Sequence, residues 1–224
     1  MSKKYLYEED FGKIKSIEIA RRLLKDKSEI TYGMVKCREK GYFNEDHMKL
    51  INAHQNDAKT RSAEKKTFRN AIFDSWSIIG IDYEVNIEPH TKRNIDVLFN
   101  YDGQLWLGEA KGPKSSGDEP LLKAILEIYT YSQLINKEQL FNDYQNNLLW
   151  VGDVLKDKSN LKLAIIVFEN KDGKPSPMFR QLVKEDQYEP VRELMKQLKI
   201  YAIKAESFCN GKVEFFDGFS PREY

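Results

Sequence analysis

The stretch from Asn94 to Lys111, NIDVLFNYDGQLWLGEAK, limits the possible folds of this chain more than any other segment. Its centre, Asp102-Gly103, is among the strongest two-residue signals for a tight β-hairpin turn. Both faces of the flanking segments are apolar near their middle, which predicts strands with layers packed on both sides. We therefore expect an inner hairpin in which Leu98 faces Leu107 across the two strands.

The same hairpin carries three ionisable residues, Asp96, Glu109 and Lys111, toward one end. A symmetric turn places Asp96 directly opposite Glu109, with Cβ atoms about 4.5–5.5 Å apart. Lys111 projects from the same face as Glu109 because side chains alternate along a strand. Buried charges are costly unless they are paired, protonated or bound to a cation. Two interpretations are open: a catalytic metal site, or an edge salt-bridge cluster of the kind that contributes about 0–1 kcal/mol.

Carboxylate oxygens are the ligands that Mg²⁺ prefers, usually one or two of them together with water and substrate phosphate. A lysine beside such an ion can orient water or stabilise charge developing on phosphate. Glu64 lies one turn before Phe68 on a helix whose apolar side is expected to pack on the sheet, so it extends that side toward the same site. The alternative for Glu64 is an ordinary first-turn acid, which the helix dipole favours.

The remaining pattern predicts a helical extension over residues 1–58 and an α/β domain over residues 59–224. The elements expected in the domain are a helix within 61–80, a strand at 81–88, the hairpin, a helix at 121–135, a strand at 163–168, a helix at 188–199, a strand at 200–208 and a last hairpin turn at 210–212. The strand at 81–88 alternates strictly, so Asp82 and Glu84 are expected on a solvated face. A three-strand meander that crosses by helices to buried strands indicates a mixed sheet flanked by helices.

Composition points to a cytoplasmic protein that binds no membrane. Cys37 and Cys209 lie far apart, so a disulfide framework is not expected and a reducing compartment is the default. The chain has no run of about 18 apolar residues, and its N-terminus lacks the apolar region of a secretory signal. Lys and Arg outnumber Asp and Glu between Met1 and Lys66, whereas the rest is mildly acidic. This basic segment fits either a nucleic-acid partner or a solvated charged surface.

The motifs NID, ending at Asp96, and GEAK, from Gly108 to Lys111, resemble those of the PD-(D/E)XK nuclease superfamily. Ile95 stands where the family name has a proline, a position that many members vary. The resemblance spans roughly Arg61 to Phe168 and implies a restriction-endonuclease-like αβββαβ core. It further implies Mg²⁺- or Mn²⁺-dependent hydrolysis of phosphodiesters, usually of DNA. Asp96 and Glu109 would then be metal ligands, and Lys111 would assist the attacking water.

The resemblance also bears on residues outside these motifs. The family's first helix often donates a glutamate, which matches Glu64. Some branches carry Gln-x-x-x-Tyr on the helix after the third strand. Here Tyr129 and Gln133 stand in the opposite order, so they are secondary candidates, with helix packing and a surface amide as the alternative.

Three basic residues flank the proposed site in sequence: Lys92, Arg93 and Lys114. Contacts from these side chains to phosphates would make nucleic-acid binding depend on salt. The alternative is that they are simply solvated, as lysines on loops usually are.

Together these features predict a Mg²⁺- or Mn²⁺-dependent nuclease acting on DNA. The resemblance also allows a homodimer, because many members of the superfamily form dimers. Two alternatives stay open: a nucleic-acid-binding or protein-interaction module without chemistry on the same fold, and an RNA-directed nuclease. Single-strand binding proteins usually expose aromatic stacking platforms, whereas the aromatic residues here fall mostly at core spacing. This spacing favours recognition of a duplex or of its backbone.

Overall fold

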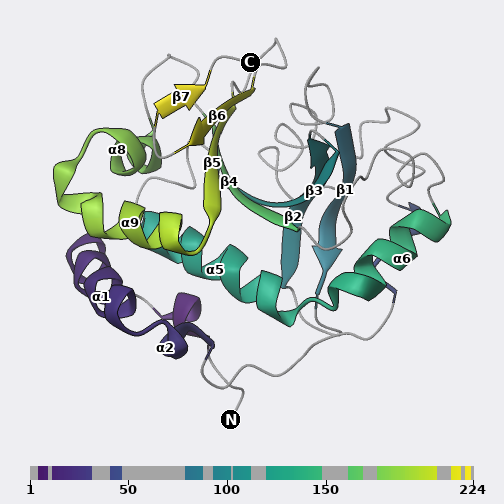
Figure 1. Cartoon of the computed structure of the whole chain (residues 1–224), viewed down its shortest axis with the longest axis horizontal. Coiled ribbons are helices and arrows are strands. Elements are labelled where there is room, and N and C mark those ends of the chain that lie inside the picture. The colour runs from purple at the N-terminus through teal and green to yellow at the C-terminus, as the bar shows by residue number, and fades with distance from the viewer. Residues whose placement is uncertain are drawn as a thin grey trace.

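The computed structural model describes residues 5–9, 12–31, 41–46, 79–87, 93–101, 103–111, 120–147, 161–168, 176–205, 213–217 and 220–222 (Figure 1). The strands are β1 (Ile79–Asn86), β2 (Asn94–Tyr101), β3 (Gln104–Lys111), β4 (Lys162–Phe168), β5 (Ile200–Ala205), β6 (Val213–Asp217) and β7 (Ser220–Arg222). The helices are η1 (Leu6–Glu8), α1 (Lys13–Lys25), α2 (Ser28–Thr31), α5 (Leu121–Leu134), α6 (Lys137–Asn147), α8 (Pro177–Val183), η2 (Asp186–Tyr188) and α9 (Glu189–Gln197).

The strands form one mixed sheet whose spatial order follows the sequence from β1 to β7. The meander β1–β2–β3 is antiparallel, β3, β4 and β5 are parallel neighbours, and β6 and β7 continue antiparallel. Each parallel step is made through helices, as parallel strands require. The mixed α/β sheet expected from the sequence is thus confirmed. Residues 61–78 of the expected first helix and the domain boundary near residue 58 lie outside the described residues. The expected end of that helix was wrong, because Ile79 and Gly80 pair with β2 as the start of β1.

The central hairpin has the register that the Asp-Gly turn predicts. Leu98 pairs with Leu107, and Gly103 takes the positive φ of 69° that glycine adopts at little cost. The paired ladder between β2 and β3 ends at Val97 and Gly108. The next residue on each strand is the predicted carboxylate, so the proposed site begins where the ladder ends.

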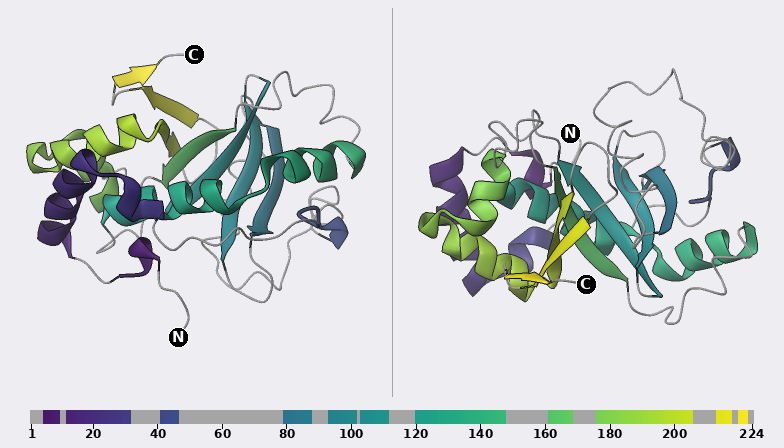
Figure 2. Two further views of the ribbon diagram at one scale, coloured as in Figure 1. Left: turned by 60° about the horizontal axis from the view of Figure 1, so that its bottom comes forward. Right: turned by 90° about the horizontal axis from the view of Figure 1, so that it is seen from above.

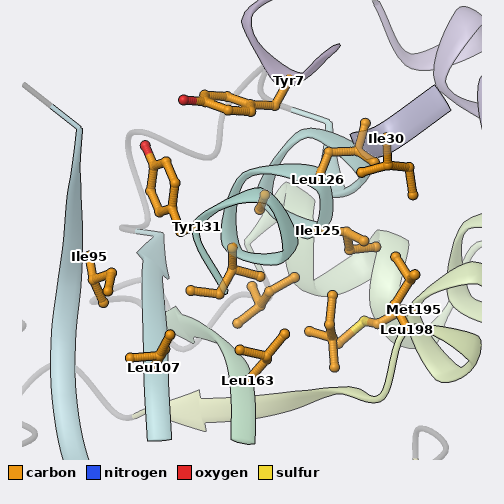
Figure 3. Close-up of a cluster of buried hydrophobic side chains, with 14 of the residues drawn as sticks. Tyr7, Ile30, Ile95, Leu107, Ile125, Leu126, Tyr131, Leu163, Met195 and Leu198 are labelled. Atoms are coloured by element: carbon orange, nitrogen blue, oxygen red, sulfur yellow. The ribbon is translucent and has the colours of Figure 1, made fainter. Parts of the chain in front are cut away.

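The main core lies between the sheet and the helices that cover one face of it (Figure 2). Helix α5 packs across β3 and β4, α9 packs on β5, α1 packs on α9, and η1 packs on α5. In the close-up, Leu107 and Leu163 of the sheet lie beneath Ile125 of α5 and Met195 of α9 (Figure 3). The second apolar cluster, on the other face, draws all its described members from strands, with Phe99, Trp106 and Ile166 among them. The hairpin is therefore buried on both faces, as the sequence predicts.

Helix α5 is the element that connects this core to the proposed site. It forms from a segment rich in leucine and isoleucine, and side chains on almost every side of it are buried. None of the helices among the described residues is long and apolar enough to cross a membrane.

Strand β1 departs from the half-solvated pattern expected of it. Asp82 is fully buried, and its carboxylate accepts hydrogen bonds from the Tyr144 hydroxyl on α6 and from the Tyr83 backbone N–H. Its register against β2 shifts between Gly80 and Asp82, and Glu84 adopts a positive φ of 48°. The expectation of a solvated Asp82 was wrong because α6 covers this side of the strand.

The Tyr144 hydroxyl should stabilise the fold measurably. Tyr144→Phe leaves the buried Asp82 carboxylate short of a donor, so we expect the free energy of unfolding to fall by about 1–3 kcal/mol. Urea unfolding at neutral pH measures this change. Tyr129→Phe, at a partly buried tyrosine on α5, is the matched control and should shift the value by less than about 0.5 kcal/mol. Equal values for the two variants would contradict the role of this bond.

Candidate functional site

The end of β3 carries a buried ion pair. Leu105, Leu107, Glu109 and Lys111 project from the face that α5 covers, because side chains alternate along the strand. Glu109 is 4% exposed and Lys111 8% exposed, and the Lys111 Nζ lies 2.8 Å from Glu109 Oε1. The pair is therefore buried inside the molecule, which differs from the solvent-exposed salt bridge considered as the alternative.

Helix α5 adds a second carboxylate to the lysine. Glu127 Oε2 lies 3.1 Å from Lys111 Nζ, and Glu127 Oε1 accepts a hydrogen bond of 2.9 Å from the Tyr131 hydroxyl. Residues four apart share one face of a helix, so Glu127 and Tyr131 reach the end of β3 together. Neither residue was predicted from the sequence as part of the site. The available signal was that Glu127 is the one acidic residue in the apolar helix α5.

Asp96 completes the group from β2. Its Oδ2 accepts a hydrogen bond of 2.9 Å from the backbone N–H of Ala110, just beyond the last paired residues of the hairpin. The Asp96 charge acts on Glu109. The paired register ends at Val97 and Gly108, so the direct pairing of Asp96 with Glu109 expected from the turn is not part of the ladder. We refer to Asp96, Glu109, Lys111, Glu127 and Tyr131 as the β3–α5 cluster.

The two glutamates of the cluster differ in their protonation. Burial raises the pKa of Glu109 well above its ordinary value, and the nearby Asp96 charge raises it further, while Lys111 opposes both. Burial also acts to raise the pKa of Glu127, but the Lys111 charge and the side-chain hydrogen bonds with Tyr131, Lys111 and Glu109 outweigh it and lower that pKa. Glu127 is thus the ionised partner of the lysine, and Glu109 is the carboxyl that favours a proton.

The donor set suits a hard divalent cation. Glu109 Oε2 is buried and has no hydrogen-bond partner among the residues that the structure describes, which is costly for a carboxyl oxygen. Within those residues no group of three or more His, Cys, Asp or Glu side chains is arranged as a metal site. Mg²⁺, however, usually takes one or two carboxylates and completes its shell with water and phosphate. Asp96 and Glu109 meet that requirement. Glu64, the third ligand considered, lies outside the described residues.

The N-terminal segment packs beside the cluster. Arg93, at the start of β2, donates to Glu8 Oε1 from Nε (3.1 Å) and from Nη2 (2.6 Å), and its guanidinium lies 4.6 Å from the centre of the Tyr5 ring. The Tyr7 ring meets the Tyr131 ring edge-on, with centroids 5.6 Å apart, and both hydroxyls point to the same side of α5 (Figure 3). Burial raises the pKa of Tyr7 to about 12, so the Tyr7 hydroxyl stays protonated near neutral pH.

The other candidates from the sequence lie apart from the cluster or outside the described residues. Tyr129 packs against the main core, and Gln133 is exposed and donates to the Ser132 hydroxyl. Arg93 is engaged with Glu8, and its contact with phosphate stays a prediction. Lys92 and Lys114 belong to the part of the chain that the structure leaves undescribed.

Comparisons of the chain with protein-family models, with curated proteins and with solved structures find no match. The case for a function therefore depends on the chemistry of the β3–α5 cluster and on the motifs that carry its residues.

The raised pKa of Glu109 predicts how stability varies with pH when a chelator excludes metal ions. Above the ordinary pKa of 4.5, the unfolded chain loses this proton before the folded protein does. The folded state then binds more protons, so Glu109 lowers the free energy of unfolding as pH rises, by at most about 1.4 kcal/mol per pH unit. Glu109→Gln should remove this decline, as measured by urea unfolding from pH 5 to pH 8.

Glu138→Gln, on the exposed side of α6, is the control and should keep the wild-type dependence on pH. Parallel curves for wild type and Glu109→Gln would show that Glu109 is ionised across the whole range and would contradict the assignment.

Proposed function

We propose that this protein is a divalent-metal-dependent nuclease that hydrolyses phosphodiester bonds of DNA, on the restriction-endonuclease-like fold of the PD-(D/E)XK superfamily. The observation that carries the proposal is the buried Glu109–Lys111 pair beside Asp96, in which one oxygen of Glu109 has no hydrogen-bond partner among the residues that the structure describes. Two carboxylates and an ammonium group at the end of adjacent strands are the groups that metal-assisted phosphodiester hydrolysis needs.

Each residue of the cluster has a distinct task in this proposal. Asp96 and Glu109 would hold Mg²⁺ or Mn²⁺, which when bound supplies a Lewis acid and a more acidic bound water. Lys111 directs its ammonium group toward charge that develops on the scissile phosphate. That interaction is strong because the ammonium is largely shielded from water and is already fixed by its partners. Glu127 and Tyr131 hold the lysine in place from α5.

The basic residues of the N-terminal segment, together with Lys92 and Lys114, would contact the phosphate backbone, and a homodimer would place two such sites on one duplex. A binding module on the same fold without catalysis is the main alternative. The active-site residues favour an enzyme, since the three residues of the catalytic motif are all present. The same chemistry would cut RNA, so the substrate must be determined by experiment.

The test is cleavage of plasmid, linear duplex and single-stranded DNA, and of RNA, with Mg²⁺, with Mn²⁺ and with chelator. We expect metal-dependent cutting of DNA that falls at least about 100-fold in Asp96→Asn and in Lys111→Met. Asp96→Asn keeps the Glu109–Lys111 pair, and Lys111→Met keeps most of the side-chain volume. Lys184→Ala, at an exposed lysine after α8, should cut at the wild-type rate.

Circular dichroism and urea unfolding establish that each variant is folded, which is needed because removing one member of a buried ion pair is destabilising. A folded wild-type protein that cuts none of these substrates would overturn the proposal. Cutting of RNA alone would replace DNA as the substrate and leave the chemistry in place.

A further inference from the structure

Lys111 occupies a position between two carboxylates that belong to different elements. Its Nζ lies 2.8 Å from Glu109 Oε1 on its own strand and 3.1 Å from Glu127 Oε2 on the helix above. Both contacts are ion pairs, the one with Glu127 is also a hydrogen bond, and the Lys111 side chain is 10% exposed. The ammonium group therefore bridges sheet and helix at the centre of the β3–α5 cluster.

The two carboxylates are not equivalent. Both oxygens of Glu127 are engaged, one by Lys111 and one by the Tyr131 hydroxyl. Glu109 has one oxygen on Lys111, while its Oε2 has no hydrogen-bond partner within the described ranges, on a side chain that is 5% exposed. A cation arriving at the cluster can therefore gain a ligand from Glu109 Oε2, whereas both oxygens of Glu127 already accept a hydrogen bond.

Charge balance points the same way. Taken by themselves and fully ionised, the three carboxylates and one ammonium group of the β3–α5 cluster carry more negative than positive charge, and a divalent cation would offset that difference. Buried charge without compensation is costly, which accounts for the position of Lys111 Nζ 2.8 Å from Glu109 Oε1.

We propose that Lys111 and the divalent cation compete for Glu109, and that Glu127, fixed by Tyr131, is the positioning residue that retains Lys111 once the cation has displaced it from Glu109. This inference deepens the proposed nuclease function and rests on it for the identity of the cation. Glu127 acts on metal binding through Lys111 and is not itself a metal ligand. Tyr131 acts in turn through Glu127.

The experiment is a double-mutant cycle of Mn²⁺ affinity, measured by calorimetry on the whole chain without nucleic acid. Lys111→Met removes the competitor and should raise the affinity. Glu127→Gln removes the carboxylate that holds Lys111 from α5, so that Lys111 pairs with Glu109 alone. It should lower the Mn²⁺ affinity by about 3- to 10-fold, a range typical of coupled neighbours. In the Lys111→Met background, Glu127→Gln should change the affinity by less than about twofold.

A variant that keeps all formal charges separates positioning from general electrostatics. Tyr131→Phe frees Glu127 without altering the charge of the cluster, so it should lower Mn²⁺ affinity in the wild-type background and have no effect beside Lys111→Met. Glu138→Gln removes an exposed carboxylate of α6 and is the control for charge alone, with the wild-type affinity expected.

The outcomes also separate this inference from the nuclease proposal. An equal effect of Glu127→Gln in both backgrounds would make Glu127 a direct ligand or a simple charge and would overturn the inference, even if metal-dependent cutting were found. Absence of Mn²⁺ binding by folded wild type at millimolar metal would overturn it as well. The predicted cycle in a protein that cuts no nucleic acid would sustain the inference and exclude the nuclease.

Discussion

The bridge that Lys111 makes between Glu109 and Glu127 is the interaction on which the proposed site depends. It joins the end of β3 to the middle of α5, inside a layer that is otherwise apolar. Burying an ion pair removes two charges from water, and an apolar pair of similar volume is often equally or more stabilising. Stability alone therefore does not account for four ionisable side chains at this position. The Oε2 atom of Glu109 is buried without a hydrogen-bond partner among the described residues, and the proposed function would use that oxygen as a metal ligand.

The geometry of the bridge originates in a turn at the far end of the hairpin. The positive φ of Gly103 sets the register, and the register carries down the ladder to Val97 and Gly108, where pairing ends. Beyond that point the Asp96 side chain accepts a hydrogen bond from the backbone N–H of Ala110, which keeps the carboxylate next to the end of β3. A shift of one residue would turn the charged set of β3 to the opposite face, away from α5. The turn therefore fixes, through the strand register, which face of β3 the site residues occupy.

This dependence explains which parts of the structure could be predicted from the sequence. Turn chemistry and alternation are local, so the hairpin, its register and the positions of Asp96, Glu109 and Lys111 follow from short stretches. The strands of the sheet and helix α5 were also predictable, because their apolar patterns are long and regular. The short helix α8 and the edge strand β7 were not anticipated, since neither shows a sustained period.

The missed residues share a different cause. Which side of α5 faces Lys111 depends on how the helix sits on the sheet, and a helix apolar on nearly all sides gives no sign of that orientation. The sequence therefore indicates Tyr129 and Gln133 on helix α5. In the structure, Glu127 of the same helix contacts Lys111, and Tyr131 contacts Glu127. The burial of Asp82 beneath Tyr144 and the pairing of Arg93 with Glu8 also join segments distant in sequence. Such pairings follow from tertiary packing and leave no local pattern.

Burial makes the ionised form of Glu109 unfavourable, and the same burial would strengthen the binding of a cation to it. A low-dielectric site raises the free energy of an uncompensated carboxylate, and it strengthens by the same physics any attraction between that carboxylate and a cation. A proton, the Lys111 ammonium group and a divalent ion would then all compete for the same carboxylate, that of Glu109. The ammonium of Lys111 already lies 2.8 Å from Glu109 Oε1, and burial together with the Asp96 charge raises the pKa of the same carboxyl, at a position that a cation of higher charge would take over in the proposed function. If the proposed function holds, a divalent cation held by Asp96 and Glu109 would balance the cluster, and Lys111, still held by Glu127, would face the point where phosphate approaches.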